Sequence, residues 1–159
     1  MNENFREASD LLEAAIRIER AGIELYQKLY EAASDSNLRD LFNFLSAEEE
    51  KHAGVFRKLL EGVADYIPRY KYPGEYEQYL EGIAYRMIGA SKKAAEFIEA
   101  KNNVEAIGMA VELEKMSVEF YSEAKKYFSG AGLNCVQGII DEEKGHQAKL
   151  EALKGNLKF

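Results

Sequence analysis

Hydrophobic residues recur every three to four positions through four long stretches of the chain, which is the period of a helix with one buried face. Both prolines, Pro68 and Pro73, lie between the second and the third stretch, so neither interrupts a helix. Short polar or glycine-containing segments, 34–37 and 129–134, separate the remaining pairs. The pattern predicts helices at about residues 10–33, 38–61, 103–128 and 135–153.

Residues typical of helix ends support three of these boundaries. Asp10 and Glu13 have the spacing of a capping box, in which two side chains satisfy free backbone amides at the start of a helix. Gly62 and Gly155 are suited to the end of a helix. We therefore expect the first helix to begin at Asp10, and the second and fourth helices to end near these glycines.

Residues 63–103 depart from this regular pattern. The Tyr-rich segment 65–79 contains both prolines and is expected to follow an irregular path, whereas residues 79–100 could form one or two short helices. Short turns make neighbouring helices antiparallel, and a long connection crosses a bundle from end to end. The prediction is an all-α four-helix bundle formed by one domain, 1–159, with a hairpin at about 10–62, a crossover at about 63–103 and a second hairpin at about 104–154.

Each predicted helix carries a polar residue inside its apolar stripe. The first and third helices have a glutamate there, and the second and fourth have a Glu-x-x-His pair, which uses both histidines of the chain. Residues three apart on a helix project side by side, so each pair directs one oxygen and one nitrogen into the same space. The six residues are Glu19, Glu49, His52, Glu114, Glu143 and His146.

The two predicted hairpins repeat the same residues. When segment 18–30 is laid over segment 113–125, Glu19 falls on Glu114 and Tyr26 on Tyr121. The two Glu-x-x-His pairs match at an offset that is one residue shorter. A repeated hairpin with repeated chemistry predicts a bundle with pseudo-two-fold symmetry.

Four carboxylates and two imidazoles that face one interior favour a site for two divalent cations. Without a counter-charge, each buried ion costs several kcal/mol. A Glu from each of two helices and a Glu-x-x-His from each of the other two form the ligand pattern of dinuclear sites in ferritin-like bundles. The alternative is that Glu19 and Glu114 reach water from the edges of their stripes while the histidines are ordinary core residues. The matched sets favour the metal site.

The remaining repeated or reactive residues have less specific roles. Tyr26 and Tyr121 either belong to the core or hold a metal-binding carboxylate through the hydroxyl, because a buried tyrosine needs a hydrogen-bond partner. Cys135 is expected to pack. We expect the other acidic residues to face solvent or the rim of the site: Glu24, Glu48, Glu50, Glu112, Glu119 and Glu142.

Composition narrows the class of protein. The net charge of −7 argues against binding to nucleic acid or to an anionic membrane, since both require clustered basic residues. No apolar run approaches the roughly 18 residues of a membrane span, and no targeting segment is visible. A single cysteine excludes a disulfide framework and agrees with a reducing compartment. We expect a soluble cytoplasmic protein.

These residues resemble the rubrerythrin-like diiron proteins of the ferritin-like superfamily. The resemblance rests on E-x6-Y at Glu19 and Glu114, on EEKHAGVFRKLLEG at 49–62 and on EEKGH at 142–146. It implies two iron ions bound by the six residues, with Glu49 and Glu143 as bridges, the other two glutamates as terminal ligands and one histidine on each iron. Nitrogen and carboxylate ligands also suit manganese and zinc.

Two features depart from the family. Rubrerythrins proper have a further glutamate three residues after the ligand in the third helix, which iron exchanges for histidine on reduction, and here that position is Ser117. A rubredoxin-like iron site needs four cysteines, and the chain has one. Electrons are therefore expected from a separate donor protein such as a rubredoxin.

Three functional classes follow from these observations. The leading prediction is a diiron oxidoreductase that reduces peroxide, acting as a homodimer. The second is a ferroxidase or iron-handling protein that uses dioxygen or peroxide. The third is a metal-binding bundle without redox turnover.

Overall fold

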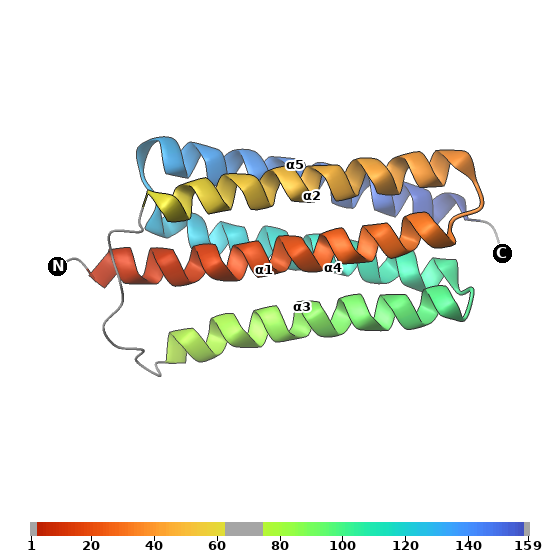
Figure 1. The fold of residues 1–159 in the computed structure, drawn as a ribbon, viewed down its shortest axis with the longest axis horizontal. Helices are drawn as coiled ribbons and strands as arrows, with labels where there is room; N and C mark the ends of the chain where they lie inside the picture. Colours follow the sequence, from red (N-terminus) through yellow and green to blue (C-terminus); the bar gives the residue numbers. More distant parts are fainter. Residues whose placement is uncertain (1–2, 63–74, 158–159) are drawn as a thin grey trace.

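Helices make up nearly all of the chain that the structure describes. The computed structural model describes residues 3–62 and 75–157, in which there are five α-helices and no strand (Figure 1). A short 3-10 helix, Lys125–Tyr127, follows the fourth of them. The all-α prediction is confirmed. The helices are α1 (Glu3–Ala32), α2 (Ser36–Glu61), α3 (Glu75–Glu99), α4 (Asn103–Ala124) and α5 (Gly130–Asn156).

The helices form two antiparallel hairpins, α1 with α2 and α4 with α5, as the sequence predicts. Helices α2 and α4 run in the same direction, because α3 carries the chain back along the length of the bundle (Figure 1). Helix α3 packs against α1 and α4. The bundle therefore has four helices around its interior and a fifth on the outside of the α1 and α4 side.

The crossover prediction is partly wrong, because one long helix occupies residues 75–99 in place of one or two short ones. Ile83, Met87, Ser91 and Ala94 are buried at intervals of three or four residues, so α3 presents one continuous face to α1 and α4. This packing stabilises a length of helix that local propensity alone does not predict. Residues 63–74, where most of the predicted irregular path falls, lie outside the described residues.

Four helix ends differ from the prediction. Helix α4 ends at Ala124 and is followed by a short 3-10 helix, whereas one helix to about residue 128 was expected. Helix α1 begins at Glu3, and Asp10 lies within it, so the predicted capping box is wrong. Helix α5 begins at Gly130 and continues through Gly155 to Asn156. No proline interrupts either extension, and contacts in the bundle outweigh the low helix propensity of glycine.

The ends of α2 agree with its polar sequence. The side chain of Asp35 accepts hydrogen bonds from the backbone amides of Asn37 and Leu38, which are free at the start of the helix. The helix ends at Gly62, as predicted, with an ordinary right-handed backbone conformation. Asp35 thus fixes the short turn between α1 and α2.

Burial agrees with the predicted stripes over most of their length. Tyr26, Leu45 and Phe56 are buried, whereas Tyr30 is 36 % exposed near the end of α1. Cys135 is exposed, so the expectation that it packs is wrong: it lies in the first turns of α5, one residue before the buried face that starts at Val136. Among the described residues, no helix is both long enough and apolar enough to cross a membrane.

Candidate metal centre

All six polar residues predicted at interior positions are buried in the four-helix interior. Helix α1 supplies Glu19, α2 supplies Glu49 and His52, and α4 supplies Glu114. Glu143 and His146 come from α5. None of the six is more than 4 % exposed. The structure thus brings together every residue that the sequence singled out for the site.

The six residues form two overlapping groups in the described part of the chain. In each group, four side chains offer ligand atoms that lie within 4.8 Å of one another, a geometry that could hold a metal ion. Glu49 and Glu143 belong to both groups. The first group is completed by Glu19 and His52, and the second by Glu114 and His146.

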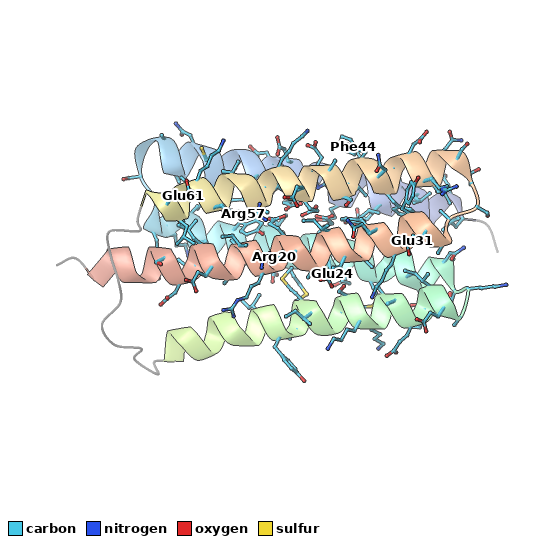
Figure 2. The ribbon with its side chains drawn as sticks, in the orientation of Figure 1. Arg20, Glu24, Glu31, Phe44, Arg57 and Glu61 are labelled. Atoms are coloured by element: carbon cyan, nitrogen blue, oxygen red, sulfur yellow. The ribbon has the colours of Figure 1, made fainter. Side chains whose placement is uncertain are left out.

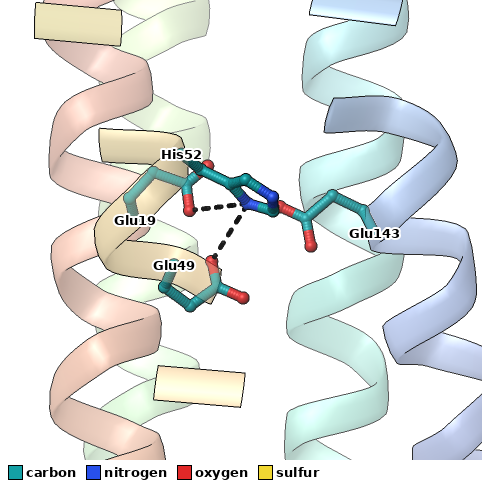
Figure 3. A group of neighbouring side chains, drawn as sticks. All are labelled: Glu19, Glu49, His52 and Glu143. Carbon is teal, nitrogen blue, oxygen red and sulfur yellow. Dashed lines mark ion pairs between the residues drawn. The ribbon is translucent and has the colours of Figure 1, made fainter. Parts of the chain in front are cut away.

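The first group gathers around Nδ1 of His52 (Figure 3). This nitrogen lies 3.6 Å from Oε2 of Glu19 and 3.9 Å from Oε2 of Glu49. Oε1 of Glu143 approaches it from the opposite hairpin at 3.3 Å. Three carboxylate oxygens and one imidazole nitrogen therefore surround one small space.

The second group repeats this arrangement around Nδ1 of His146. Oε1 of Glu49 lies 3.5 Å from this nitrogen, Oε2 of Glu114 lies 3.9 Å away and Oε2 of Glu143 lies 3.1 Å away. Glu49 and Glu143 therefore each direct one carboxylate oxygen to one group and the other oxygen to the second group. A carboxylate placed in this way could bridge two metal ions.

Both tyrosine hydroxyls hold a carboxylate of the site. Tyr26 on α1 donates a hydrogen bond to Glu114 on α4, and Tyr121 on α4 donates one to Glu19 on α1. Each tyrosine thus holds the glutamate of the opposite hairpin. The sequence left two roles open for these tyrosines, core packing or a hydrogen bond to a carboxylate. The hydrogen bond is present at both tyrosines, and it joins the two hairpins.

The charges in this cluster are strongly coupled. Burial, and then the charge of Glu49, raise the pKa of Glu19 and of Glu114 well above 4.5. Burial opposes a charged ring at His52, but contacts with Glu143 and Glu19 outweigh it and raise the pKa to about 12. The raised pKa of Glu19, Glu114 and His52 favours protonation of these groups, which offsets part of the buried negative charge when no metal is bound.

The other half of the cluster behaves in the same way. Burial opposes ionisation at His146, but contacts with Glu143 and Glu49 raise its pKa to about 9. Glu143 is buried too, yet its contacts with His146 and His52 lower its pKa to about 2. The ring of His146 is thus also protonated at neutral pH in the metal-free protein.

The side chains of the cluster do not satisfy one another fully. Within the part of the chain that the structure describes, four buried side-chain atoms have no hydrogen-bond partner: Oε2 of Glu19, Oε1 of Glu49, Nδ1 of His52 and Oε1 of Glu143. A buried polar atom without a partner costs about 1–3 kcal/mol. Three of these atoms lie together around His52 in the first group, and Oε1 of Glu49 approaches His146 in the second. Divalent cations coordinated by the two groups would therefore remove this cost. The residues therefore fit a dinuclear metal site.

Gly22 gives Glu49 room to lie against α1. A Cβ atom at Gly22 would be 3.3 Å from the carboxyl carbon of Glu49, which is closer than nine in ten contacts of real Cβ atoms. In the internal repeat, the counterpart of Gly22 is Ser117, which is also small and buried. Small residues at both positions leave space beside the cluster.

A small pocket occupies this space, with a cavity volume of about 10 Å³. Glu49 and Glu114 of the cluster line it, and so does Met87 of α3. This volume is close to the minimum that one water molecule needs. The sequence did not predict that α3 contributes to the surroundings of the site. The pocket is lined by Ile18, Gly22, Tyr26, Glu49, Met87, Leu113, Glu114 and Ser117.

The other acidic residues mostly face outward as predicted. Glu24 and Glu119 are exposed, and Glu24 is labelled with Arg20 along α1 in Figure 2. Glu142 differs, because its carboxylate is 56 % exposed yet its Oε2 lies 2.7 Å from Nε2 of His52. The sequence placed Glu142 at the rim and missed this contact, which joins residues of different hairpins.

Comparison with known proteins agrees with this geometry. No curated protein and no solved structure matches the chain. The model of the rubrerythrin family matches residues 10–154, which include both hairpins and all six clustered residues. The chain therefore belongs to the rubrerythrin family.

Proposed function

We propose that this protein is a non-haem diiron oxidoreductase that reduces hydrogen peroxide with electrons from a separate donor protein. One observation carries the proposal: two buried groups of ligand atoms share Glu49 and Glu143 in a chain of the rubrerythrin family. The shared carboxylates place the two groups side by side, which suits a two-electron reaction at paired metal ions.

Each metal ion would have one nitrogen ligand and three carboxylates. His52 and Glu19 would hold one ion, and His146 and Glu114 would hold the other, with Glu49 and Glu143 between them. These donors suit iron, manganese and zinc, and membership of the rubrerythrin family favours iron. The four carboxylates balance the charge of two divalent ions.

When bound, two ferrous ions would each supply one electron, so that hydrogen peroxide, two electrons and two protons give two molecules of water. The electrons would be restored one at a time by the donor protein. The protein side chains hold and orient the site: the tyrosine hydroxyls fix Glu19 and Glu114, and the surrounding apolar core excludes bulk water. The small pocket beside Glu49 and Glu114, close in size to one water molecule, lies next to the proposed metal positions.

Ser117 replaces the further glutamate of rubrerythrins proper, so this chain lacks one carboxylate that the family resemblance would imply. Ser117 lines the pocket. At this position, rubrerythrins proper have a glutamate that takes part in the movement of iron. Four carboxylates therefore remain to hold the ions in both oxidation states. We propose that the ligand set stays fixed during turnover.

The experiment that tests the proposal is anaerobic loading with ferrous iron, followed by addition of one equivalent of peroxide. About two irons per chain, one peroxide consumed per two irons and a ferric absorption band are expected. Glu49→Gln should abolish the stoichiometric reaction, whereas Glu50→Gln, which changes the exposed next residue, should leave it unchanged. Equal consumption by both variants would overturn the proposal.

A ferroxidase would behave differently in the same experiment. With dioxygen and an excess of ferrous iron, it would oxidise many irons per chain and release or store them. The proposed peroxide reductase retains two irons per chain and turns over only when a reductant restores them. Oxidation of excess iron without reductant would therefore contradict the proposal and favour the second class.

A further inference from the structure

The two halves of the site differ in the residues that surround the two histidine rings. Nδ1 of His52 faces the cluster, while its Nε2 lies 2.7 Å from Oε2 of Glu142, on α5 of the other hairpin. The ring is 2 % exposed and the carboxylate is 56 % exposed, so Glu142 reaches inward from the surface. This carboxylate and the cluster lie on opposite sides of the same ring.

His146 has different surroundings. The edge of its ring meets Phe44, with ring centroids 6.2 Å apart and planes at 87°. The residue that corresponds to Glu142 in the internal repeat is Glu48, which precedes Glu49 as Glu142 precedes Glu143. Glu48 forms an ion pair with Lys51 on its own helix. The two glutamates are thus equivalent in sequence but not in contact.

One residue of the sequence accounts for this difference. Lys51 stands three positions after Glu48, the spacing at which helical side chains meet. The residue three positions after Glu142 is Gly145, which has no side chain to compete for the carboxylate. The ion pair that the structure gives Glu142 is with His52. Gly145 therefore leaves Glu142 free to reach the opposite hairpin.

A carboxylate on the outer nitrogen changes what the inner nitrogen can do. In the neutral ring, Nε2–H donates a hydrogen bond to Glu142, which fixes the orientation of the ring and the tautomer whose Nδ1 lone pair faces the cluster. We propose that Glu142 is a positioning residue that makes the metal position at His52 the tighter of the two. This inference rests on the proposed dinuclear site, and it adds that the metal position at His52 is filled before the position at His146.

Titration of the metal-free protein with Co²⁺ tests the inference by calorimetry and visible absorption. Two steps are expected for the unchanged protein, the first of them tighter. Glu142→Gln should weaken the first step by about 10-fold, the lower end of the effect of such outer partners, and shift its absorption bands. The second step should keep its affinity. Glu48→Gln is the matched control, and should leave the first step unchanged.

A second variant tests the same contact by giving Glu142 a competing partner on its own helix. Gly145→Lys places a lysine three positions after Glu142, copying the pair of Lys51 with Glu48, and a Cβ at Gly145 meets nothing within 4 Å. It should draw Glu142 away from His52 and weaken the first step as Glu142→Gln does. A weakened first step in both variants, with the thermal midpoint of the metal-free protein preserved, would support the inference.

The two proposals fail in different ways. Binding of fewer than two Co²⁺ per chain by the unchanged protein would overturn the dinuclear site itself. Binding of two Co²⁺ with equal affinity, or an unchanged first step in Glu142→Gln, would overturn only the role of Glu142. Equal weakening of both steps would also overturn it, because it would show a general effect of charge.

Discussion

The two tyrosine hydroxyls donate hydrogen bonds from one hairpin to the other, so each hairpin helps to position a buried glutamate of its neighbour. Tyr26 and Tyr121 are both buried, and each donates to a carboxylate that is itself buried. A carboxyl group in this position has few alternatives, since no bulk water reaches it. The hydrogen bonds therefore contribute to stability as well as to the geometry of the site.

Tyr26→Phe tests this contribution because it removes the hydroxyl and keeps the ring. We expect the free energy of unfolding of the metal-free protein to fall by about 1–3 kcal/mol, since a buried oxygen of Glu114 loses its donor. Denaturation with urea measures the change. Tyr85→Phe is the control, because Tyr85 is exposed, and it should change stability by less than about 0.5 kcal/mol. Equal effects would contradict the role of the hydrogen bond.

Gly22→Ala separates the stability of α1 from the binding of metal. Alanine favours a helix over glycine by about 1 kcal/mol, but its Cβ would displace the carboxylate of Glu49. We expect the metal-free protein to gain little stability and the affinity for Co²⁺ to fall at both positions, since Glu49 belongs to both groups. Thermal unfolding and calorimetry measure the two effects.

Gly54→Ala is the matched control for this substitution. Gly54 lies within α2, and a Cβ there meets nothing within 4 Å. It should raise the thermal midpoint and leave metal affinity unchanged. If Gly22→Ala gave the same result, close approach of Glu49 to α1 would not matter for the site.

At the scale of the helices, the interior faces of the four bundle helices could be predicted, whereas for the outer helix only helical character, and not its full length, could be predicted. The stripes that contain Glu19 and Glu114 follow from local spacing, which the sequence displays directly. The length of α3 depends on its packing against α1 and α4, where Ile83 and Met87 are buried, and packing between distant segments cannot be read from local sequence. The prediction that Asp10 caps the first helix was wrong because α1 extends further toward the N-terminus, to Glu3.

Met87→Ala tests whether α3 is an integral part of the bundle. Met87 is buried and lines the pocket beside Glu49 and Glu114. Truncation should lower the free energy of unfolding by about 2–5 kcal/mol, through lost burial and the cavity left behind. Ile88→Ala, at the next and more exposed position, should cost much less. A loss similar to that of Ile88→Ala would mean that α3 packs only loosely.

At the scale of the whole molecule, the composition of the site was predictable but part of its environment was not. The two Glu-x-x-His pairs and the repeat identified all six clustered residues, because buried charges inside apolar stripes need a common explanation. The contact of Glu142 with His52 joins two hairpins, and Glu142 reads as a surface residue on its own helix. The sequence signal for this contact is that Gly145 stands where the first hairpin has Lys51. This difference can be interpreted only once the fold shows that Glu142 lies beside His52.

The pKa shifts of the cluster make the stability of the metal-free protein depend on pH. The raised pKa of His146, from 6.5 to about 9, means a contribution that is complete below pH 6.5 and lost as the pH rises toward 9. His52 acts in the same direction, and so do Glu19 and Glu114, whose pKa is raised. Glu143 acts in the opposite direction, because its pKa is lowered to about 2 and its contribution is lost below pH 4.5.

The metal-free protein should therefore be most stable at about pH 5, and its free energy of unfolding should fall steadily toward pH 9. Metal ions compete with the protons on the two rings and on Glu19 and Glu114, so binding releases protons and strengthens as the pH rises. Thermal unfolding with and without saturating Co²⁺, from pH 5 to pH 9, measures both trends. The increase in midpoint caused by Co²⁺ should grow with pH, while the midpoint without metal falls. A midpoint of the metal-free protein that rises from pH 5 to pH 9 would contradict the coupling of these charges, because every raised pKa in the cluster requires the opposite sign.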